Sequence, residues 1–465
     1  MTDTAAALAR THGKTAQLGA HDTGEVPRPG YSWYVIGVLI LANIMSSVDR
    51  QLLALLVAPI RHDLAISDTQ ISLLQGLSFA LFYAVMGLPF GWLADRTNRR
   101  NLIIVGVFFW SLMTLACGLA SSFGELFSAR VGVGIGEAAL LPAAYSMIAD
   151  YFPPARCGRA LGAFTIAQFA GVGVSWGVGG AIIHSLDSGV SVSLPLVGQL
   201  ASWKLSFAVV GSAGFVLCPL LLTVREPVRR GLRVAAATGA ASGASLWSYF
   251  RRHRAAFIPV YLVYGLMAFV GYNFQAWLPT YFERRYHVPA AAAGIQMGLI
   301  ISVAGMLGCI LGGLLGDLWT AQGRIGGKFR LTALWWALAL ASSIAIFVAS
   351  SASTCLLYVG LQNIGAAIAL SSAAASIQDI VPNELRGRST AVYLLMIGIV
   401  GFGMGPSAVA LVTDHVFHND AALRYSLLVV PVPAILCGAA LTWIGLEPYR
   451  RVYDSLRGRA VPAGG

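Results

Sequence analysis

The sequence predicts an all-α membrane protein with twelve transmembrane helices in two six-helix halves. Its composition is the first reason: of 465 residues, 57% are hydrophobic and only 11% are charged, and the mean hydropathy is +0.71. Because soluble domains carry roughly 25% charged residues, this composition indicates a polytopic membrane protein. The other two reasons are a series of apolar segments of membrane-spanning length and an internal repeat.

Twelve apolar segments reach the ~20 residues that a helix needs to cross a bilayer. Short loops that contain most of the charged residues separate them. The predicted spans are 33–60, 68–93, 101–121, 125–151, 157–184, 203–224, 255–282, 289–316, 330–350, 354–381, 387–414 and 425–446.

Positive charge gathers in every second loop and so predicts the orientation. The net charge of +11 is concentrated in segments such as 96–100, 225–233 and 251–254, whereas the loops of the other side hold few cations, among them Arg61 and Arg284. Because positively charged loops stay in the cytoplasm, both termini are expected there, in a multi-pass protein of the cell (inner) membrane. This pattern explains the charge without a nucleic-acid partner.

Three short motifs of the first half recur in the second half at offsets of 222, 229 and 221 residues. They are Gly-x-x-x-Asp at 91–95 and 313–317, Asp-x-x-Pro at 150–153 and 379–382, and Glu-Pro at 226–227 and 447–448. Two six-helix halves in parallel repeat, with a site between them near the membrane midplane, are typical of a large class of secondary transporters.

The repeat also divides the chain into its expected parts. An Ala/Gly/Ser-rich stretch separates the halves, and the aromatic and basic residues that follow it near 246–254 suit the inner membrane interface. The parts are a disordered cytoplasmic tail at 1–30, an N-terminal half at 31–224, a cytoplasmic linker with this interfacial segment at 225–254, a C-terminal half at 255–448, and a cytoplasmic tail at 449–465.

Two opposite charges, Arg130 and Glu137, lie well inside the fourth span. Seven residues of α-helix make almost two turns, so both side chains share one face, about 10 Å apart along the axis. A charge at the bilayer centre costs at least ~2.5–3.5 kcal/mol and usually faces a cavity or a partner. Asp49 and Arg50 in the first span point about 100° apart and cannot simply neutralise each other. Arg130 and Glu137 are therefore their expected partners.

The loop after the second span carries Gly91-x-x-x-Asp95-Arg96-x-x-Arg99-Arg100, which resembles the signature of the major facilitator superfamily. Within that superfamily the chain resembles the Spinster family of lipid transporters. The matching residues are Val48-Asp49-Arg50, Ser67-Asp68-x-Gln70, Trp110-Ser111 and Arg130-x-Gly132-Val-Gly134-Ile-Gly136-Glu137. The match is dense over the first half, and it departs at Ser46 and Ser47, where a polar-aromatic pair is expected.

The signature residues are expected to form a conformational latch. A carboxylate at a helix C-terminus is opposed by its own helix dipole, whereas Arg96, Arg99 and Arg100 suit that end. Asp95 is therefore expected to contact the N-terminus of another helix. The resemblance implies the eleventh helix, which begins near Arg386, and such a contact across the halves on the cytoplasmic side favours the outward-open state.

The two halves differ in a way that bears on the substrate. The interior charges all lie in the first six spans, whereas spans seven to twelve offer only neutral polar and aromatic groups. A cavity with one charged wall and one apolar wall suits an amphiphile whose headgroup lies at Arg130 and, less deeply, at Arg50. Arginine is well fitted to phosphate. The expected substrate-binding residues of the second half are Tyr272, Asn273, Trp277, Gln362 and Asn363.

These features predict a secondary transporter that moves a lysophospholipid-like or sphingoid-phosphate-like amphiphile by alternating access. Protons are the expected driving ion, with Asp49 and Glu137 as the coupling carboxylates, because the protonation of a buried carboxylate depends on whether a nearby arginine is engaged elsewhere. A proton-coupled carrier of small organic anions or drug-like compounds is the alternative. No catalytic set, nucleotide loop or metal-ligand spacing is visible, so we expect no enzyme activity, cofactor or metal. We expect the protein to be a monomer that is surrounded by membrane lipids.

Overall fold

The computed structural model describes residues 29–187, 193–194, 198–199, 201–229, 246–322, 326–382 and 385–457. Twelve helices in these ranges are long and apolar enough to cross a membrane, which confirms the predicted fold class. Most of the expected tail at 1–30, the centre of the linker and the last eight residues lie outside the described residues.

The N-terminal half contains six spans, some of them broken into two helices. Its elements are α2 (Pro29–Leu55), α3 (Val57–Leu64), α4 (Asp68–Gln75), α5 (Leu77–Arg96), α6 (Arg99–Leu119), α7 (Phe123–Glu137), α8 (Leu140–Tyr151), α9 (Pro154–Asp187), the short antiparallel pair β1 (Ser193–Leu194) and β2 (Gly198–Gln199), and α10 (Ser202–Leu222).

The C-terminal half repeats this plan after the short helix α12 (Leu246–Arg252). Its final helix runs past residue 448, so the first part of the expected tail is helical. The elements are α13 (Arg254–Tyr286), α14 (Ala290–Ala321), α15 (Gly327–Val348), α16 (Ala352–Asp379), α17 (Arg386–Met396), the π-helix η2 (Ile397–Met404), α18 (Gly405–Val412), the π-helix η3 (Thr413–Phe417), the 3-10 helix η4 (Asp420–Ala422), α19 (Leu423–Val429) and α20 (Pro431–Leu456).

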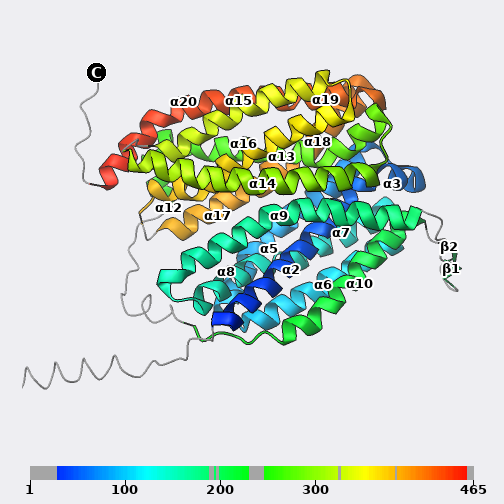
Figure 1. The fold of residues 1–465 in the computed structure, drawn as a ribbon, viewed down its shortest axis with the longest axis horizontal. Helices are drawn as coiled ribbons and strands as arrows, with labels where there is room; N and C mark the ends of the chain where they lie inside the picture. Colours follow the sequence, from blue (N-terminus) through cyan, green and yellow to red (C-terminus); the bar gives the residue numbers. More distant parts are fainter. Residues whose placement is uncertain are drawn as a thin grey trace, which may run out of the picture.

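The two halves form two layers of long helices (Figure 1). Helices α9 and α14 make the most extensive contact between the layers, and glycines allow it. A Cβ atom on Gly298 of α14 would come within 2.6 Å of the Gly177 backbone nitrogen of α9. Small residues at such positions let membrane helices approach closely.

We call the end of the bundle that carries the turn at 96–100 the inner end, as the charge pattern predicts. At the outer end, α4 packs on α18 and the eleventh span contacts α5 through η2. Gly76, between α4 and α5, has no Cβ, and one built there would meet Gly403 O of η2 at 3.2 Å. The principal partners of α17, at the inner end, are helices of its own half. The halves are therefore joined at the outer end.

Ion pairs at the inner end preserve the internal repeat. Arg99 pairs with Asp150 in the first half, and Lys328 pairs with Asp379 at 3.3 Å in the second, so both partners are displaced by the same 229 residues. Arg99 Nε also donates to Glu226 Oε1 at 2.7 Å. The signature arginine thus ties the inner ends of three spans of its own half together.

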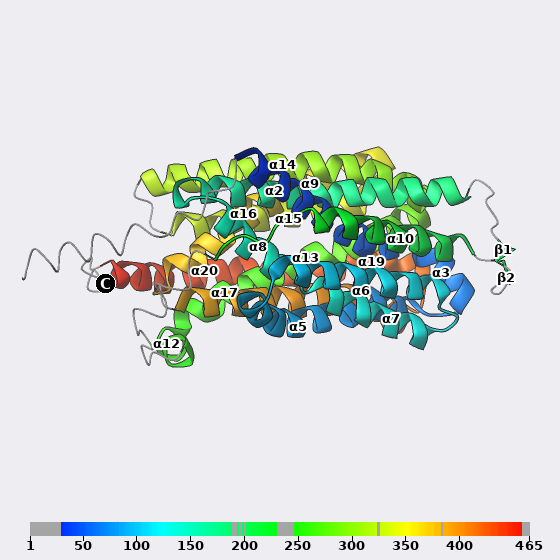
Figure 2. The same ribbon diagram turned by 90° about the horizontal axis from the view of Figure 1, so that it is seen from below.

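The predicted interfacial segment is the helix α12, which lies beside the inner end of the bundle, where α20 also ends (Figure 2). Its residue Phe250 stacks on Phe257 at 4.4 Å, and Tyr249 donates to the Ile380 carbonyl at 3.0 Å. Trp247 is 73% exposed, next to the exposed Arg251. An anchored helix that presents tryptophan and arginine outward suits a membrane interface.

Candidate functional site

Four charged side chains from two helices form a buried cluster inside the N-terminal half. Asp49 and Arg50 come from the last two turns of α2, and Arg130 and Glu137 from α7. The helix breaks directly after Glu137, and α8 begins at Leu140. The seven-residue spacing brings both α7 side chains to the face of α2, as predicted.

The cluster consists of two crossed ion pairs. Arg130 NH1 lies 3.2 Å from Asp49 Oδ1, and both side chains are only 1% exposed. Arg50 NH1 lies 3.6 Å from Glu137 Oε2, whose side chain is fully buried. The expected pairing between the two spans is therefore present, and each charge finds its partner on the other helix. Such geometry offsets the several kcal/mol per ion that burial costs.

Hydroxyl groups complete the pairing of both carboxylates. Thr114 Oγ1 on α6 donates to Asp49 Oδ2, and Ser46 Oγ donates to Glu137 Oε2 at 2.6 Å. Among the described residues, Glu137 Oε1 and Arg130 Nε are buried without a hydrogen-bond partner. The sequence noted Ser46 only as a departure from the family pattern, and nothing in the sequence singled out Thr114. One oxygen of Glu137 is thus an open acceptor.

Arg50, and not Arg130, is the accessible arginine of the cluster. Its side chain is 18% exposed against 1% for Arg130, whereas depth in the span led to the expectation that Arg130 contributes more to binding. The ring of Phe79 lies beneath both guanidinium groups, 5.5 Å from Arg50 and 5.8 Å from Arg130. Arg50 also lies near the phenols of Tyr83 and Tyr272. Tyr272 belongs to α13 of the other half.

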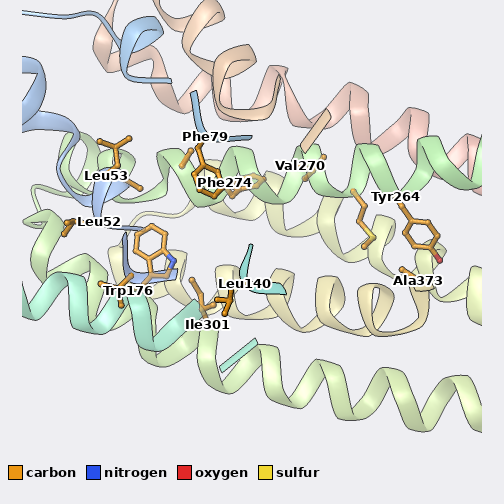
Figure 3. Packing of buried hydrophobic residues seen from close by; sticks show 14 of the residues in the cluster. Leu52, Leu53, Phe79, Leu140, Trp176, Tyr264, Val270, Phe274, Ile301 and Ala373 are labelled. Atoms are coloured by element: carbon orange, nitrogen blue, oxygen red, sulfur yellow. The ribbon is translucent and has the colours of Figure 1, made fainter. Parts of the chain in front are cut away.

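An apolar cavity of about 220 Å³ is lined in part by Tyr272, the neighbour of Arg50. It is lined mainly by α13, α14 and α16, with Trp176 contributed by α9 of the other half. Figure 3 shows Trp176, Tyr264 and Ile301, which line it, among the buried apolar side chains. Tyr272 lines the cavity and also lies near Arg50, so it connects the charged cluster to the apolar space.

The predicted residues of the second half divide into two groups. Tyr272, Gln362 and Asn363 line the cavity. Two residues outside the predicted set, Gln275 and Trp176, also line it. Trp277 instead is fully buried and donates from Nε1 to the Pro406 carbonyl at 2.9 Å, which holds α13 against α18. Asn273 is also fully buried away from the cavity. The rotation of each helix about its own axis could not be predicted from the sequence, so the residues that line the cavity could not be distinguished from those that do not.

Among the described residues, the predicted latch makes no hydrogen bond or ion pair across the halves in this conformation. The side chain of Asp95 is exposed, and Arg229, at the start of the linker, donates to its backbone carbonyl. Arg96 lies over the ring of Trp92 at 4.2 Å, and the backbone N–H of Arg100 donates to Glu226. Within the described residues, no hydrogen bond or ion pair joins Asp95 to α17. Gly91 lies one turn before Asp95 on α5.

A second cluster of two arginines and two aspartates lies at the outer end, and the sequence did not predict it. Arg61 and Asp68 belong to the N-terminal half, and Arg284 and Asp420 to the C-terminal half. We call these four residues the outer ring. Burial alone would lower the pKa of Arg61, but its pairing with Asp420 and Asp68 raises it above the ordinary value. Arg61 therefore stays charged.

Three carboxylates meet around the outer ring with ligand atoms within 4.8 Å of one another: those of Asp68, Asp414 and Asp420. Such a group could in principle hold a cation. Asp68 and Asp420 are paired with guanidinium groups, however, and Asp414 Oδ2 accepts from the backbone nitrogen and the hydroxyl of Thr69, both at 2.7 Å. We therefore assign the three carboxylates to contacts within the protein.

Comparison with known proteins matches residues 39–406 to the family model described as the Major Facilitator Superfamily. The chain is 29% identical over 446 residues to an MFS-type efflux pump of Mycolicibacterium smegmatis, covering 94% of this chain and 98% of that protein. It is 27% identical to a probable galactarate/D-glucarate transporter of Bacillus subtilis, covering 63% of this chain and 66% of that protein.

The fold is also similar to the crystal structure of a bacterial homolog of the human lysosomal transporter Spinster in an inward-facing, occupied conformation. The TM-score is 0.73 at 26% sequence identity, with 94% of this chain and 100% of that chain covered. The resemblance to Spinster proteins expected from the sequence is thus confirmed.

Proposed function

Because the chain belongs to the major facilitator superfamily, we propose that it is a proton-coupled secondary transporter of an anionic amphiphile, working by alternating access. The observation that carries the proposal is the position of Arg50. This guanidinium is the exposed member of the buried cluster and lies near Tyr272, which lines the apolar cavity. One binding region thereby offers a cation for a phosphate or carboxylate headgroup and an apolar space for a chain.

The cavity supports an apolar subsite better than a complete binding pocket. Its volume of about 220 Å³ is smaller than the ~300–1,000 Å³ of sites that hold whole drug-sized ligands. A lysophospholipid or sphingoid phosphate would place part of its chain there and its headgroup outside, toward Arg50. A guanidinium binds phosphate through parallel hydrogen bonds.

Glu137 and Asp49 are the proposed proton carriers. Glu137 Oε1 is buried without a partner, and its other oxygen is held by Ser46 and Arg50. When a substrate anion engages Arg50, Glu137 loses its counter-charge, and a proton on the open oxygen restores neutrality. Asp49 depends in the same way on Arg130. The exchange requires only side chains of the N-terminal half.

The second candidate is a carrier of drug-like compounds or small organic anions. The similarity to an MFS-type efflux pump extends over almost the whole chain and favours the first of these, and the sugar-acid transporter relative favours the second. An apolar cavity with the amides of Gln275, Gln362 and Asn363 also suits a neutral aromatic compound.

Uptake into proteoliposomes under an imposed pH gradient tests the proposal. The substrates are a lysophospholipid, glucarate and an apolar dye. We expect saturable, gradient-dependent movement of the lysophospholipid, at least tenfold lower in Arg50→Ala and unchanged in Arg388→Ala, which removes an exposed arginine at the inner end. Preferential movement of glucarate or the dye, with the lysophospholipid inert, would replace the proposed substrate by the corresponding alternative.

A further inference from the structure

We propose that the outer ring is a pair-exchange gate, in which Asp68 passes from Arg284 to Arg61 when the outer end opens, while Asp414 is the contact that opening breaks outright. The ring lies where α3 and α4 of the N-terminal half meet the ends of α13 and of the eleventh span, far along the chain from one another. The inference concerns the opening of the outer end and holds whichever substrate is carried.

The strongest pairs of the ring cross between the halves. Arg284 binds Asp68 through two nitrogens, with NH1 2.7 Å from Oδ2 and NH2 2.8 Å from Oδ1. Arg61 also reaches Asp420 through two nitrogens, with NH1 2.7 Å from Oδ2, but its NH2 is as far as 3.5 Å from Oδ1. The Asp68 side chain is fully buried, whereas that of Asp420 is 55% exposed. Since exposed pairs contribute little, the two-pronged pair of Arg284 with Asp68 is the main electrostatic bond between the halves.

The same four residues also contain one pair within each half. Arg61 NH1 lies 3.0 Å from Asp68 Oδ1, and both belong to the N-terminal half. Arg284 NH2 lies 3.9 Å from Asp420 Oδ2, and both belong to the C-terminal half. If the halves separate, each takes with it one arginine and one aspartate. No charge of the ring is left without a partner, so opening replaces two cross-half pairs by two that already exist.

Asp414 has no such replacement among the described residues. Its Oδ2 accepts from the backbone nitrogen and the hydroxyl of Thr69, in the first turn of α4. A carboxylate at a helix N-terminus is stabilised by the free N–H groups and by the helix dipole. Because α4 belongs to the other half, opening the outer end breaks both bonds. Asp414 therefore stabilises the state in which the outer end is closed, and no contact among the described residues replaces its two hydrogen bonds when that end opens.

Pair exchange predicts that the two arginines of the ring differ, although both carry one charge and both bridge the halves. Removing Arg284 deletes the two-pronged cross-half pair, while Asp68 keeps Arg61 in either state. Removing Arg61 leaves the pair of Arg284 with Asp68 in place in the closed state. In the open state, where Arg61 would be the partner of Asp68, the aspartate is left unpaired. Arg284→Gln should open the outer end, and Arg61→Gln should not.

Distances between spin labels test this directly in the purified full-length protein. Gly124 at the start of α7 and Ser350 before α16 are exposed outer positions on opposite halves, and both are labelled as cysteines after the six native cysteines are replaced. We expect Arg284→Gln and Asp414→Asn each to raise the outward-open population about tenfold. Arg61→Gln should leave it within twofold or lower it.

Two outcomes overturn the inference. One is an Arg61→Gln protein that opens as far as Arg284→Gln, because the ring would then be a simple sum of bridges. The other is an Arg284→Gln or Asp414→Asn protein whose distances match the unsubstituted protein. If Arg284→Gln does not fold, Arg284→Lys replaces it, since lysine keeps the charge but loses the two-pronged geometry, and the same direction is required.

Discussion

The molecule contains two clusters of two arginines and two carboxylates, and they differ in which helices supply them. The mid-membrane cluster of Asp49, Arg50, Arg130 and Glu137 lies wholly within the N-terminal half. The outer ring is shared equally between the halves. Rocking one half against the other cannot separate the members of the first cluster, but it must separate those of the second.

Because of this difference, the two clusters respond to different events. The mid-membrane charges keep their mutual distances when the halves rock, so what changes their state is a proton or a bound anion. The outer ring responds to the rocking itself, because its cross-half pairs exist in one conformation. The same combination of two arginines and two carboxylates can thus serve binding and proton coupling in one cluster and conformational selection in the other.

The largest expected effect is on stability, at the mid-membrane cluster. Arg130→Ala leaves Asp49 buried, with Thr114 as its remaining hydrogen-bond partner among the described residues, and breaking a buried pair in this way costs about 3–5 kcal/mol. Unfolding of the purified protein in detergent, titrated with denaturant, measures the loss. The double variant Arg130→Ala/Asp49→Ala should recover most of it, because the stranded charge is gone. A double variant as unstable as the single one would mean that Arg130 acts through packing.

The second prediction concerns proton coupling and separates Glu137 from an exposed acid on the same span. Glu137→Gln mimics the permanently protonated carboxyl, so we expect binding and substrate exchange to persist while acceleration by a pH gradient disappears. Glu125→Gln, an exposed acid on the same span, is the matched control and should respond to the gradient as before. Flux in proteoliposomes with and without the gradient is the measurement. A Glu137→Gln protein with a full response would make the residue purely structural.

The mid-membrane cluster could be predicted from the sequence and the outer ring could not, for a physical reason. Charges within apolar spans are costly, so Asp49, Arg50, Arg130 and Glu137 stand out, and helical spacing fixes their shared face. Arg61, Asp68, Arg284 and Asp420 lie near span ends, where charges are ordinary, and up to 359 residues separate the partners.

The second half shows a different limit. Its spans and its parallel repeat follow from hydropathy and recurring motifs, but the rotation of a span about its own axis depends on tertiary packing. Tyr272 therefore lines the cavity, whereas Trp277 packs on α18. Asp95 shows a third limit, since its contact with the eleventh helix is expected only with the inner end closed.

Ionic strength should give the smallest effect and confine it to the outer ring. Raising salt from about 0.1 M to 1 M shortens the Debye length from ~10 Å to ~3 Å, which weakens pairs that reach solvent and spares buried ones. In the ring, Asp420 is 55% exposed and its partner Arg61 is 24% exposed, against 1% for both members of the Asp49–Arg130 pair. Exposed pairs contribute ~0–1 kcal/mol, so the outward-open population should rise about two- to threefold.

The control for that prediction is the stability difference between the unsubstituted protein and Arg130→Ala, which should not change with salt. The spin-label distances proposed for the outer ring supply the population in each buffer. The rise with salt should be smaller in Arg61→Gln, because that protein has already lost the exposed cross-half pair of Arg61 with Asp420. An equal rise in both proteins would place the salt-sensitive contact outside the ring. A salt-dependent cost of Arg130→Ala would show that water reaches the mid-membrane cluster, and the division between a buried cluster and an exposed gate would then fail.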